Sequence, residues 1–346
     1  MELDAALRAQ VTEAAGKPFL DAPVLKLKGD ASNRSYFRVG TYPQSFVVMV
    51  MPEGGAKSEE ATKGGPPPEL PFVNVQRYLV KLGVRVPRIL RFDEPAGMMV
   101  LEDLGDVTFE KALETHDREA LYAKAIDLLV DLRARAEKEK DPSCLAFTRE
   151  FDEDLYDWEF HHFREWGMEA WSGKKPTDAE RAELDRIFRA LSQTLASAPK
   201  GFTHRDYQSR NLMVKDDELV VIDFQDALLG PRQYDLVALL RDSYVELPLD
   251  LVDRMLERYC KKMAVATGQR MGLPQFKAFF DLLTVQRKLK DAGRFEFIHR
   301  VKGNPGFLVS IPASLRYVKA AFERCRDNPD VVRLQELVSR YVPELA

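Results

Sequence analysis

The sequence predicts an α+β fold with a small, β-rich N-terminal lobe and a larger, mostly helical C-terminal lobe. Short segments rich in β-branched and aromatic residues gather before residue 104, whereas apolar residues recur at helical spacing through most of the chain after Gly105. The 346 residues, 45% of them hydrophobic, suffice for one large or two medium domains with a real core. We therefore expect two units, residues 1–104 and residues 105–346, with the boundary near Leu104.

The N-terminal unit is expected to contain five strands. Their ranges are 24–28, 35–39, 45–51, 89–92 and 98–101. A short helix over residues 4–15 precedes them, because Leu3, Leu7 and Val11 recur at i, i+4 and i+8. An amphipathic helix over 72–82, stopped by Gly83, separates the third strand from the fourth.

Residues 52–71 differ from their surroundings in composition. They contain two Gly-Gly pairs and the run Pro66-Pro67-Pro68. A segment of this kind cannot build a packed core, so we expect a mobile loop.

The C-terminal unit is expected to be helical, since Leu, Ile, Phe and Val recur there at helical spacing. The expected helices cover residues 118–137, 178–197, 248–266, 274–291 and 329–340. We find no internal repeat in the sequence.

Composition weighs against several classes of protein. The net charge of -4 gives no cationic field for nucleic acid. The N-terminal residues carry charges throughout and lack the apolar core of a signal peptide, and no stretch is long and apolar enough to span a membrane. The three cysteines, Cys144, Cys260 and Cys325, are far apart, which is typical of free thiols in a reducing compartment. We expect a cytoplasmic monomer that binds neither nucleic acid nor membrane.

The most informative segment lies in the helical unit. Residues 204–211 read H-R-D-Y-Q-S-R-N, and Asp223-Phe224-Gln225 follows twelve residues after Asn211. Between them, residues 211–214 and 218–222 read as two short strands joined by a polar turn. Asp206 and Asn211 taken alone are consistent with ordinary turn residues, but that interpretation explains neither the hairpin nor Asp223.

This combination predicts phosphoryl transfer. A loop of the form H-R-D-x-x-x-x-N places a carboxylate, here Asp206, where it receives the proton of an attacking hydroxyl. Asn211 and Asp223 are the expected ligands of Mg²⁺, a hard cation that prefers oxygen ligands and phosphate partners. The expected cofactors are therefore ATP and Mg²⁺.

These residues resemble the aminoglycoside phosphotransferase family of protein-kinase-like small-molecule kinases. Within it, the chain is similar to the branch of bacterial sugar kinases that phosphorylate the anomeric hydroxyl of N-acetylmuramate and N-acetylglucosamine. The matching segments span about residues 25 to 300 and are 29–39, 101–105, 204–213, 223–225, 230–236, 286–290 and 293–295. The resemblance implies a bilobal protein-kinase-like fold, a sugar acceptor, and a structural role for Asp235 in holding the catalytic loop. For Arg205 we favour a role in supporting the loop over substrate contact.

The resemblance also implies a nucleotide site in the N-terminal lobe. A phosphate-covering turn would be formed by Gly29, Asp30, Ala31, Ser32 and Asn33. Small and polar residues allow a close backbone approach to phosphate oxygens, although an ordinary β-turn has the same composition.

Three further residues complete the expected nucleotide site. Arg34 is expected to reach a phosphate, with a surface ion pair as the alternative. Glu102 and Leu104 belong to the linker that would lie against adenine.

One departure from the kinase pattern concerns the third strand. Kinases of this fold usually carry a lysine there, but residues 46–51 contain none, and Met49 and Met51 stand near the expected place. Either Mg²⁺ together with Arg34, Lys26 or Lys28 meets the phosphate charge, or the protein is a pseudokinase. The intact Asp206, Asn211 and Asp223 favour the first interpretation.

The acceptor site is expected near the catalytic loop. The candidate substrate contacts are Tyr207, Gln208, Arg210, Gln225 and Arg287. Arg287 and Lys290 share a helix face at i, i+3 and would suit a carboxylate such as the lactyl group of N-acetylmuramate, unless that face is simply solvated. Residues 151–171, rich in aromatic and titratable groups, are either a sugar-stacking surface or an amphipathic helix with its aromatics in the core.

The favoured function is an ATP-dependent kinase making a sugar 1-phosphate in cell-wall recycling. The alternatives are a kinase of another small hydroxylated acceptor, such as an aminoglycoside or choline, and a non-catalytic nucleotide-binding regulator. Asp152, Glu153, Asp154 and Asp157 would suit a cationic acceptor, but the mixed charges of residues 151–171 weigh against it.

Overall fold

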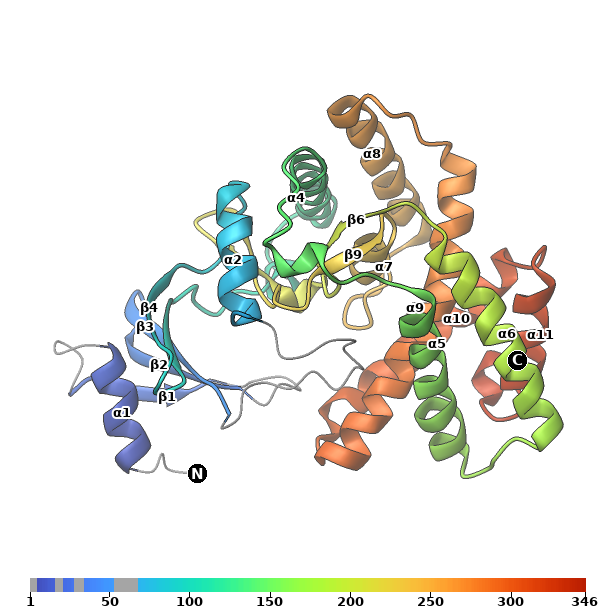
Figure 1. The fold of residues 1–346 in the computed structure, drawn as a ribbon, viewed down its shortest axis with the longest axis horizontal. Coiled ribbons are helices and arrows are strands. Elements are labelled where there is room, and N and C mark those ends of the chain that lie inside the picture. The colour runs from blue at the N-terminus through green and yellow to red at the C-terminus, as the bar shows by residue number, and fades with distance from the viewer. Residues whose placement is uncertain (1–4, 16–20, 28–33, 53–67) are drawn as a thin grey trace.

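The computed structural model describes residues 5–15, 21–27, 34–52 and 68–346. Figure 1 shows these residues as two lobes side by side, with a sheet in one and most of the helices in the other. The α+β, bilobal arrangement predicted from the sequence is confirmed.

The N-terminal lobe is built on one antiparallel sheet with the strand order β1-β2-β3-β5-β4. The strands are β1 (Val24–Lys26), β2 (Ser35–Thr41), β3 (Gln44–Val50), β4 (Ile89–Asp93) and β5 (Met98–Glu102). All five expected strands are therefore confirmed, with small shifts at their ends.

The two faces of this sheet pack against different helices. Because neighbouring residues of a strand point to opposite faces, Val48 and Met49 of β3 enter different apolar clusters. Val48 packs with Val11 of α1 (Ala5–Ala15) on one face. Met49 packs toward α2 (Pro71–Lys81), which lies between the sheet and the helical lobe in Figure 1.

Helix α2 connects the sheet to the segment that carries the catalytic motif. It starts with Pro71, which suits a first helical turn, and ends before Gly83, whose φ is 71°. The ring of Phe72 lies 4.9 Å, centroid to centroid, from that of Phe224, the residue after Asp223. The position of α2 is therefore tied to the catalytic segment by direct aromatic packing.

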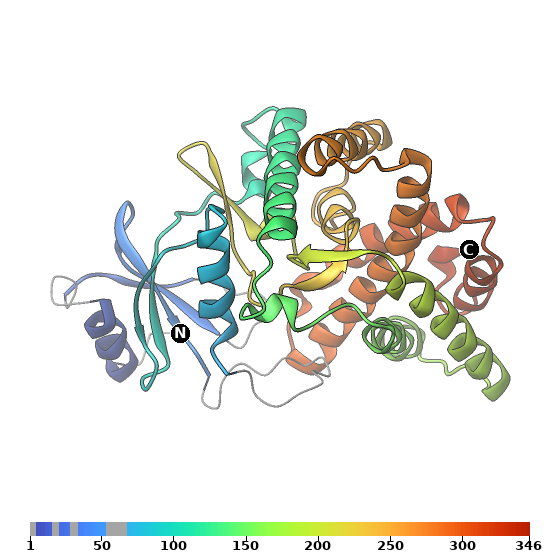
Figure 2. The ribbon, with the colours of Figure 1, turned by 45° about the horizontal axis from the view of Figure 1, so that its top comes forward.

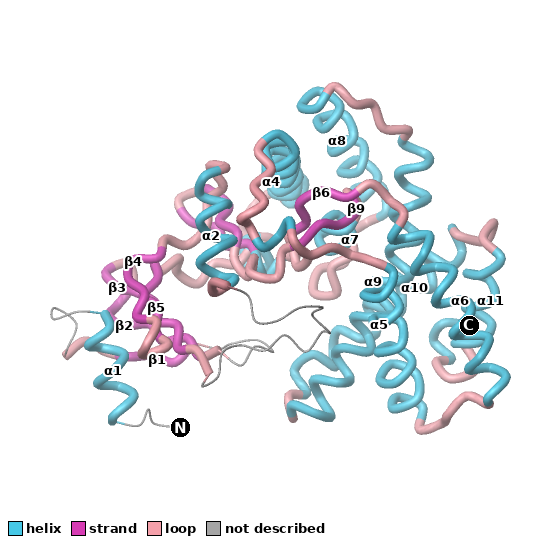
Figure 3. Tube along the Cα trace, viewed as in Figure 1, coloured by secondary structure: helices cyan, strands magenta, loops and turns pink. Residues whose placement is uncertain are grey.

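The C-terminal lobe consists of helices around two short strand pairs, as Figure 3 shows. The helices are α3 (Phe109–Ala112), α4 (Arg118–Lys138), α5 (Glu153–His162), α6 (Asp178–Ala196), α7 (Tyr234–Leu240), α8 (Leu249–Thr267), α9 (Leu273–Lys302), α10 (Ile311–Arg324) and α11 (Pro329–Val338). The strand pairs are β6 (Lys200–Thr203) with β9 (Leu228–Pro231), and β7 (Leu212–Lys215) with β8 (Glu218–Val221). In Figure 2, β6 and β9 lie beside α4 at the centre of the molecule.

Helix α9 is 30 residues long and runs through the middle of this lobe. The helix predicted over 274–291 is confirmed but continues past Gly293 to Lys302, and Gly303, with φ 68°, ends it. Gly293 marks a close approach between helices: a Cβ there would lie 2.9 Å from the Cα of Phe163. Phe163 opens a π-helical segment (Phe163–Ala170) that continues α5.

The expected helices over 118–137, 178–197, 248–266 and 329–340 are also confirmed. The β6–β9 pair and helices α3, α7 and α10 were not predicted. Two four-residue strands from distant segments leave no local pattern. The sheet ends at Glu102 and α3 begins at Phe109, while the division at Leu104 stays a prediction.

Two further sequence predictions concern loops and membranes. Most of the loop predicted over 52–71, residues 53–67, lies outside the described residues. Among the helices that the structure describes, none is long and apolar enough to cross a membrane.

Candidate active site

The catalytic loop follows β6 and is held by buried carboxylates. Asp235, in the first turn of α7, accepts the backbone N–H groups of His204 and Arg205, each at 2.9 Å. Asp242 accepts the backbone N–H of Ser209 at 2.8 Å. Arg205 has φ 81°, a left-handed conformation that a non-glycine residue adopts only when its surroundings impose it. The structural role predicted for Asp235 is confirmed.

Arg205 itself points into the interior. It is 7% exposed, its guanidinium lies 3.6 Å from Glu159 Oε1, and it stacks over the ring of Phe151. These contacts agree with the supporting role that we favoured for it.

The β7–β8 hairpin brings the three motif residues together. The side-chain amide of Asn211 donates to the backbone carbonyl of Asp206 at 2.9 Å and to Asp223 Oδ2 at 3.3 Å. Asp223 has φ 61°, so its backbone also departs from an ordinary strand end. The side chain of Asp206 is 34% exposed, which leaves its carboxylate accessible to an acceptor.

The two carboxyl groups have opposite pKa shifts. Loss of hydration and the charge of Asp206 raise the pKa of Asp223. Loss of hydration would also raise the pKa of Asp206, but positive charges, led by Lys290 and Arg287, outweigh it and lower that pKa. A carboxylate that is destabilised by a second carboxylate nearby, and that stays open to solvent, suits a bound cation.

The residues expected to bind phosphate are only partly described. Gly29, Asp30, Ala31, Ser32 and Asn33 lie outside the described residues.

Arg34 is described and precedes β2. It hydrogen-bonds the hydroxyl of Tyr36, and burial raises the pKa of that hydroxyl while Arg34 opposes the shift and Asp223 adds to it. Arg34 and Tyr36 therefore lie close to the expected metal ligand.

The side chain of Glu102 does not face a ligand. It is buried in ion pairs with Arg85 at 2.5 Å and Lys215 at 3.0 Å. Lys215 also donates to the backbone carbonyl of Asp103 at 2.8 Å. Burial opposes the ionisation of Glu102, but these cations lower its pKa to about 2. Glu102 therefore fastens the linker to β7, and contact of its side chain with a nucleotide does not fit the structure.

Leu104 lies in a small apolar cluster at the same linker. It packs with Met213, Val220 and Ile222, and both Leu104 and Met213 are 8% exposed. Contact of Leu104 with adenine stays a prediction. Met213, which stands two residues after Asn211 on the predicted strand, was not among the predicted nucleotide contacts.

Two of the expected substrate contacts are corrected by the structure. Tyr207 is 0% exposed and donates its hydroxyl to the carbonyl of Ala125, so it belongs to the core. Arg287 is 1% exposed and donates to the carbonyl of Arg205 at 2.8 Å and to Asp206 Oδ1 at 3.2 Å. Arg287 therefore lies beneath the catalytic loop, where a substrate carboxylate does not reach it.

The other candidate substrate residues lie around the catalytic groups, and their substrate contacts stay predictions. Gln225 donates to Asp223 Oδ1 at 2.9 Å and to Asp226 at 3.0 Å. Arg210 pairs with Glu110 at 2.8 Å and stacks 3.7 Å above the ring of Tyr244. Gln208 is half-buried and shapes the loop through its backbone.

Residues 151–171 form helix α5 and the π-helical segment. Phe151, Tyr156 and Phe160 are buried, as expected for an amphipathic helix with aromatics in the core. His161 pairs with Asp157 at 3.2 Å. Within the described part of the chain, no group of three or more His, Cys, Asp or Glu could hold a metal. Asn211 and Asp223, the two expected Mg²⁺ ligands, would leave the remaining coordination positions to phosphate oxygens and water.

Among the described residues, none of the lysines named as substitutes for the third-strand lysine faces the catalytic groups, and Lys28 lies outside the described residues. Met49 is 0% exposed within the core, and Lys26 is exposed over the ring of Phe37. Arg38 of β2 is bound to Asp103 at 2.6 Å and to Asp106 at 2.9 Å.

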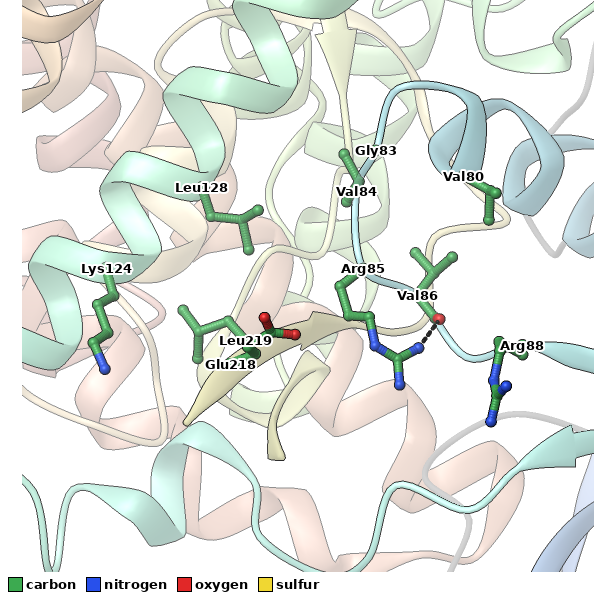
Figure 4. Close-up of a pocket in the computed structure, with 10 residues that line it drawn as sticks. All are labelled: Val80, Gly83, Val84, Arg85, Val86, Arg88, Lys124, Leu128, Glu218 and Leu219. Carbon is green, nitrogen blue, oxygen red and sulfur yellow. Dashed lines mark hydrogen bonds between the residues drawn. The ribbon is translucent and has the colours of Figure 1, made fainter. Parts of the chain in front are cut away.

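A pocket of about 600 Å³ lies between the end of α2, α4 and β8 (Figure 4). It is lined by the loop after α2, by Lys124 and Leu128 of α4, and by Glu218 and Leu219 of β8. Its lining includes no residue of the predicted catalytic set, so we do not assign it to the reaction.

Comparisons with known proteins identify the family of this chain. The model of the phosphotransferase enzyme family matches residues 24–273. The N-acetylmuramate/N-acetylglucosamine kinase of Pseudomonas aeruginosa is 34% identical over 92% of this chain and 88% of its own length. The enzyme of the same name from Neisseria meningitidis is 33% identical, over 89% of each chain.

Solved structures show the same fold at lower identity. The ADP-bound aminoglycoside phosphotransferase APH(2'')-Ib has a TM-score of 0.58 and 16% identity, over 91% of this chain and 98% of its own. The choline kinase LicA from Streptococcus pneumoniae has a TM-score of 0.54 and 13% identity, over 88% of this chain and 93% of its own. The family match and the curated relatives show that the chain belongs to the phosphotransferase enzyme family, as its resemblance to the aminoglycoside phosphotransferases predicted.

Proposed function

We propose that the protein is an ATP- and Mg²⁺-dependent kinase that phosphorylates the anomeric hydroxyl of N-acetylmuramate, N-acetylglucosamine or both, in cell-wall recycling. The observation that carries the proposal is the grouping of Asp206, Asn211 and Asp223 around one accessible point. The names and the extent of the curated relatives support the choice of acceptor.

In this proposal, Asp206 orients the acceptor hydroxyl and takes its proton. The lowered pKa of Asp206 keeps the carboxylate ionised at neutral pH. An anomeric hydroxyl is more acidic than an ordinary alcohol, so a carboxylate with a low pKa is an adequate base. Positioning and charge stabilisation supply most of the rate in phosphoryl transfer.

Asn211 and Asp223 would hold Mg²⁺, which when bound neutralises charge on the phosphate oxygens. The unfavourable proximity of Asp223 to Asp206 is the feature that fits a cation there. Arg34, beside Tyr36 and near Asp223, is the described residue best placed to contact a phosphate from the N-terminal lobe.

Two of the four acidic residues that would suit a cationic aminoglycoside have structural partners instead. Asp152 caps α5 by accepting the N–H of Leu155 at 2.9 Å, and Asp157 pairs with His161. These contacts give the aminoglycoside alternative less support than the sugar.

We further propose that the enzyme acts in the cytoplasm as a monomer. Its three cysteines are free and buried in the structure, which suits a reducing compartment.

The test is ³¹P NMR of Mg-ATP reactions offered N-acetylmuramate, N-acetylglucosamine and an aminoglycoside in separate tubes. The expected result is a sugar 1-phosphate signal with an N-acetyl sugar, lost in Asp206→Ala. A phosphomonoester formed only from the aminoglycoside would refute the proposed acceptor, and no product in any tube would refute kinase activity on all three.

A further inference from the structure

One face of α9 is directed at the catalytic loop. Gln286 donates to Glu159 Oε2 of α5 at 2.7 Å, and Arg287 donates to Asp206 Oδ1 at 3.2 Å. Lys290 lies one helical turn further on, at i+4 from Gln286 and i+3 from Arg287, and therefore on the same face.

The ammonium group of Lys290 is largely enclosed but has few partners. Its side chain is 11% exposed, and the nearest carboxylate oxygen, Asp291 Oδ1, is 3.5 Å away. That distance exceeds the usual 2.7–3.2 Å of a hydrogen bond. Lys288, two residues earlier, contrasts with it, because its ammonium binds Ser243 at 2.5 Å and Asp291 at 2.7 Å. An ammonium carries three donors, so Lys290 keeps donors available for another group.

The face of α9 that carries Lys290 meets the catalytic loop through Glu159. Burial raises the pKa of Glu159, and Lys290 is the strongest charge that opposes this shift. Glu159 also lies 3.6 Å from the guanidinium of Arg205, the residue before Asp206. Lys290 and Arg287 therefore bring their positive charges to the same side of the catalytic loop.

We propose that Lys290 is a catalytic residue whose ammonium contacts the phosphoryl group during its transfer to the acceptor oxygen held by Asp206. The inference rests on the proposed function and names one more residue of that site. In the step, the bond from the γ-phosphorus to the β,γ-bridging oxygen breaks, a bond to the acceptor oxygen forms, and the hydroxyl proton passes to Asp206.

Two features favour the phosphoryl group as the partner of Lys290. The transferred group carries its charge on three oxygens and must come next to Asp206. The third strand supplies no lysine, so a cation from α9 would stabilise this charge from the opposite lobe.

The experiment compares Lys290→Gln and Lys290→Arg with the control Lys277→Gln. Lys277 is on the same helix and pairs with Asp253 at 2.8 Å, remote from the loop in sequence. We expect Lys290→Gln to lower kcat about 100-fold with both N-acetyl sugars, with each sugar KM changing less than about threefold, since the lost contact belongs to the transition state. Lys290→Arg, which keeps the charge, should retain more activity than Lys290→Gln.

Hydrolysis of ATP without acceptor is measured in parallel. It should fall by a similar factor in Lys290→Gln, because the phosphoryl group is the same in both reactions. This assay keeps the test valid if neither sugar is turned over by the wild type, an outcome that would refute the proposed acceptor but not Lys290.

Two results would overturn the inference. One is wild-type kcat in Lys290→Gln. The other is a rise in KM for N-acetylmuramate alone, which would show that Lys290 binds the lactyl carboxylate of the acceptor. Should Lys290→Gln fail to fold, Lys290→Met takes its place, and a folded Lys290→Met with wild-type kcat overturns the inference equally.

Discussion

The helical lobe surrounds the predicted catalytic groups with buried charges, whereas the described residues of the sheet lobe place few cations near them. Asp206 is contacted by Arg287 of α9, and Asp235 holds the loop backbone. On the other side, β3 presents Met49 to the core, and Arg34 is the described arginine near Asp223. In the part of the chain that the structure describes, the cation that contacts Asp206 therefore comes from the C-terminal lobe.

The largest expected effect tests the base in the helical lobe. Asp206→Asn should lower kcat about 1000-fold, since general-base catalysis contributes about 10²–10⁴-fold. The measurement is the initial rate of ADP formation at saturating sugar. Asp217→Asn is the control, because Asp217 is an exposed turn residue whose φ of 60° asparagine also tolerates. A loss below tenfold in Asp206→Asn would remove it as the base.

The junction between the lobes should be sensitive to acid. The pKa of Glu102 is lowered from 4.5 to about 2 by Arg85 and Lys215, against the effect of burial. Because the folded pKa is the lower one, this stabilisation is present above about pH 4.5 and is lost as the pH falls toward 2; it amounts to about 3 kcal/mol. Glu102→Gln should therefore lose stability against urea at pH 7, and the gap to the wild type should narrow at pH 3. An equal gap at both pH values would contradict this assignment.

The sheet lobe should not accept the missing lysine. Met49 is 0% exposed and packs against α2, so Met49→Lys would bury an ammonium that has no partner there. We expect a loss of at least about 2 kcal/mol in unfolding free energy and no decrease in KM for ATP. Met49→Leu, which nearly conserves volume, should cost less than about 1.5 kcal/mol. A lower KM for ATP in Met49→Lys would contradict the difference between the two lobes described above.

The smallest expected effect concerns the packing of α9 against Phe163. In Gly293→Ala, the new Cβ would meet the backbone of Phe163 at 2.9 Å, so the two helices must separate slightly. We expect a cost of about 1–3 kcal/mol in unfolding free energy, typical of an overpacked core. Thermal unfolding measures this cost. The control is Ala266→Gly in α8, which gives the effect of exchanging alanine and glycine in a helix away from the Phe163 contact. An unchanged Tm would show that α9 can move away from Phe163 without a loss of stability.

Local sequence patterns were enough for most of the fold. The five strands, helix α2 and the long helices follow from residue spacing, and the H-R-D motif with its hairpin identified Asp206, Asn211 and Asp223 as one group. These predictions succeeded because spacing along the chain directly reflects strand and helix geometry.

Other features depended on contacts between distant segments. The β6–β9 pair joins residues from two parts of the chain and has no local signal. Gly293 would locally weaken a helix, yet it permits the approach of α9 to Phe163.

The sequence by itself determined the fold class and the family of this protein, and it identified Asp206 as the expected catalytic carboxylate. Only the tertiary structure decided which cation contacts that carboxylate. Arg287 and Lys290 look equivalent on a helix face, but Arg287 is bound to Asp206 and to the carbonyl of Arg205, while Lys290 retains donors. Tyr207, inside the motif, points to the core. Burial and hydrogen-bond partners depend on what surrounds a side chain in space, and neighbours in the sequence do not specify that.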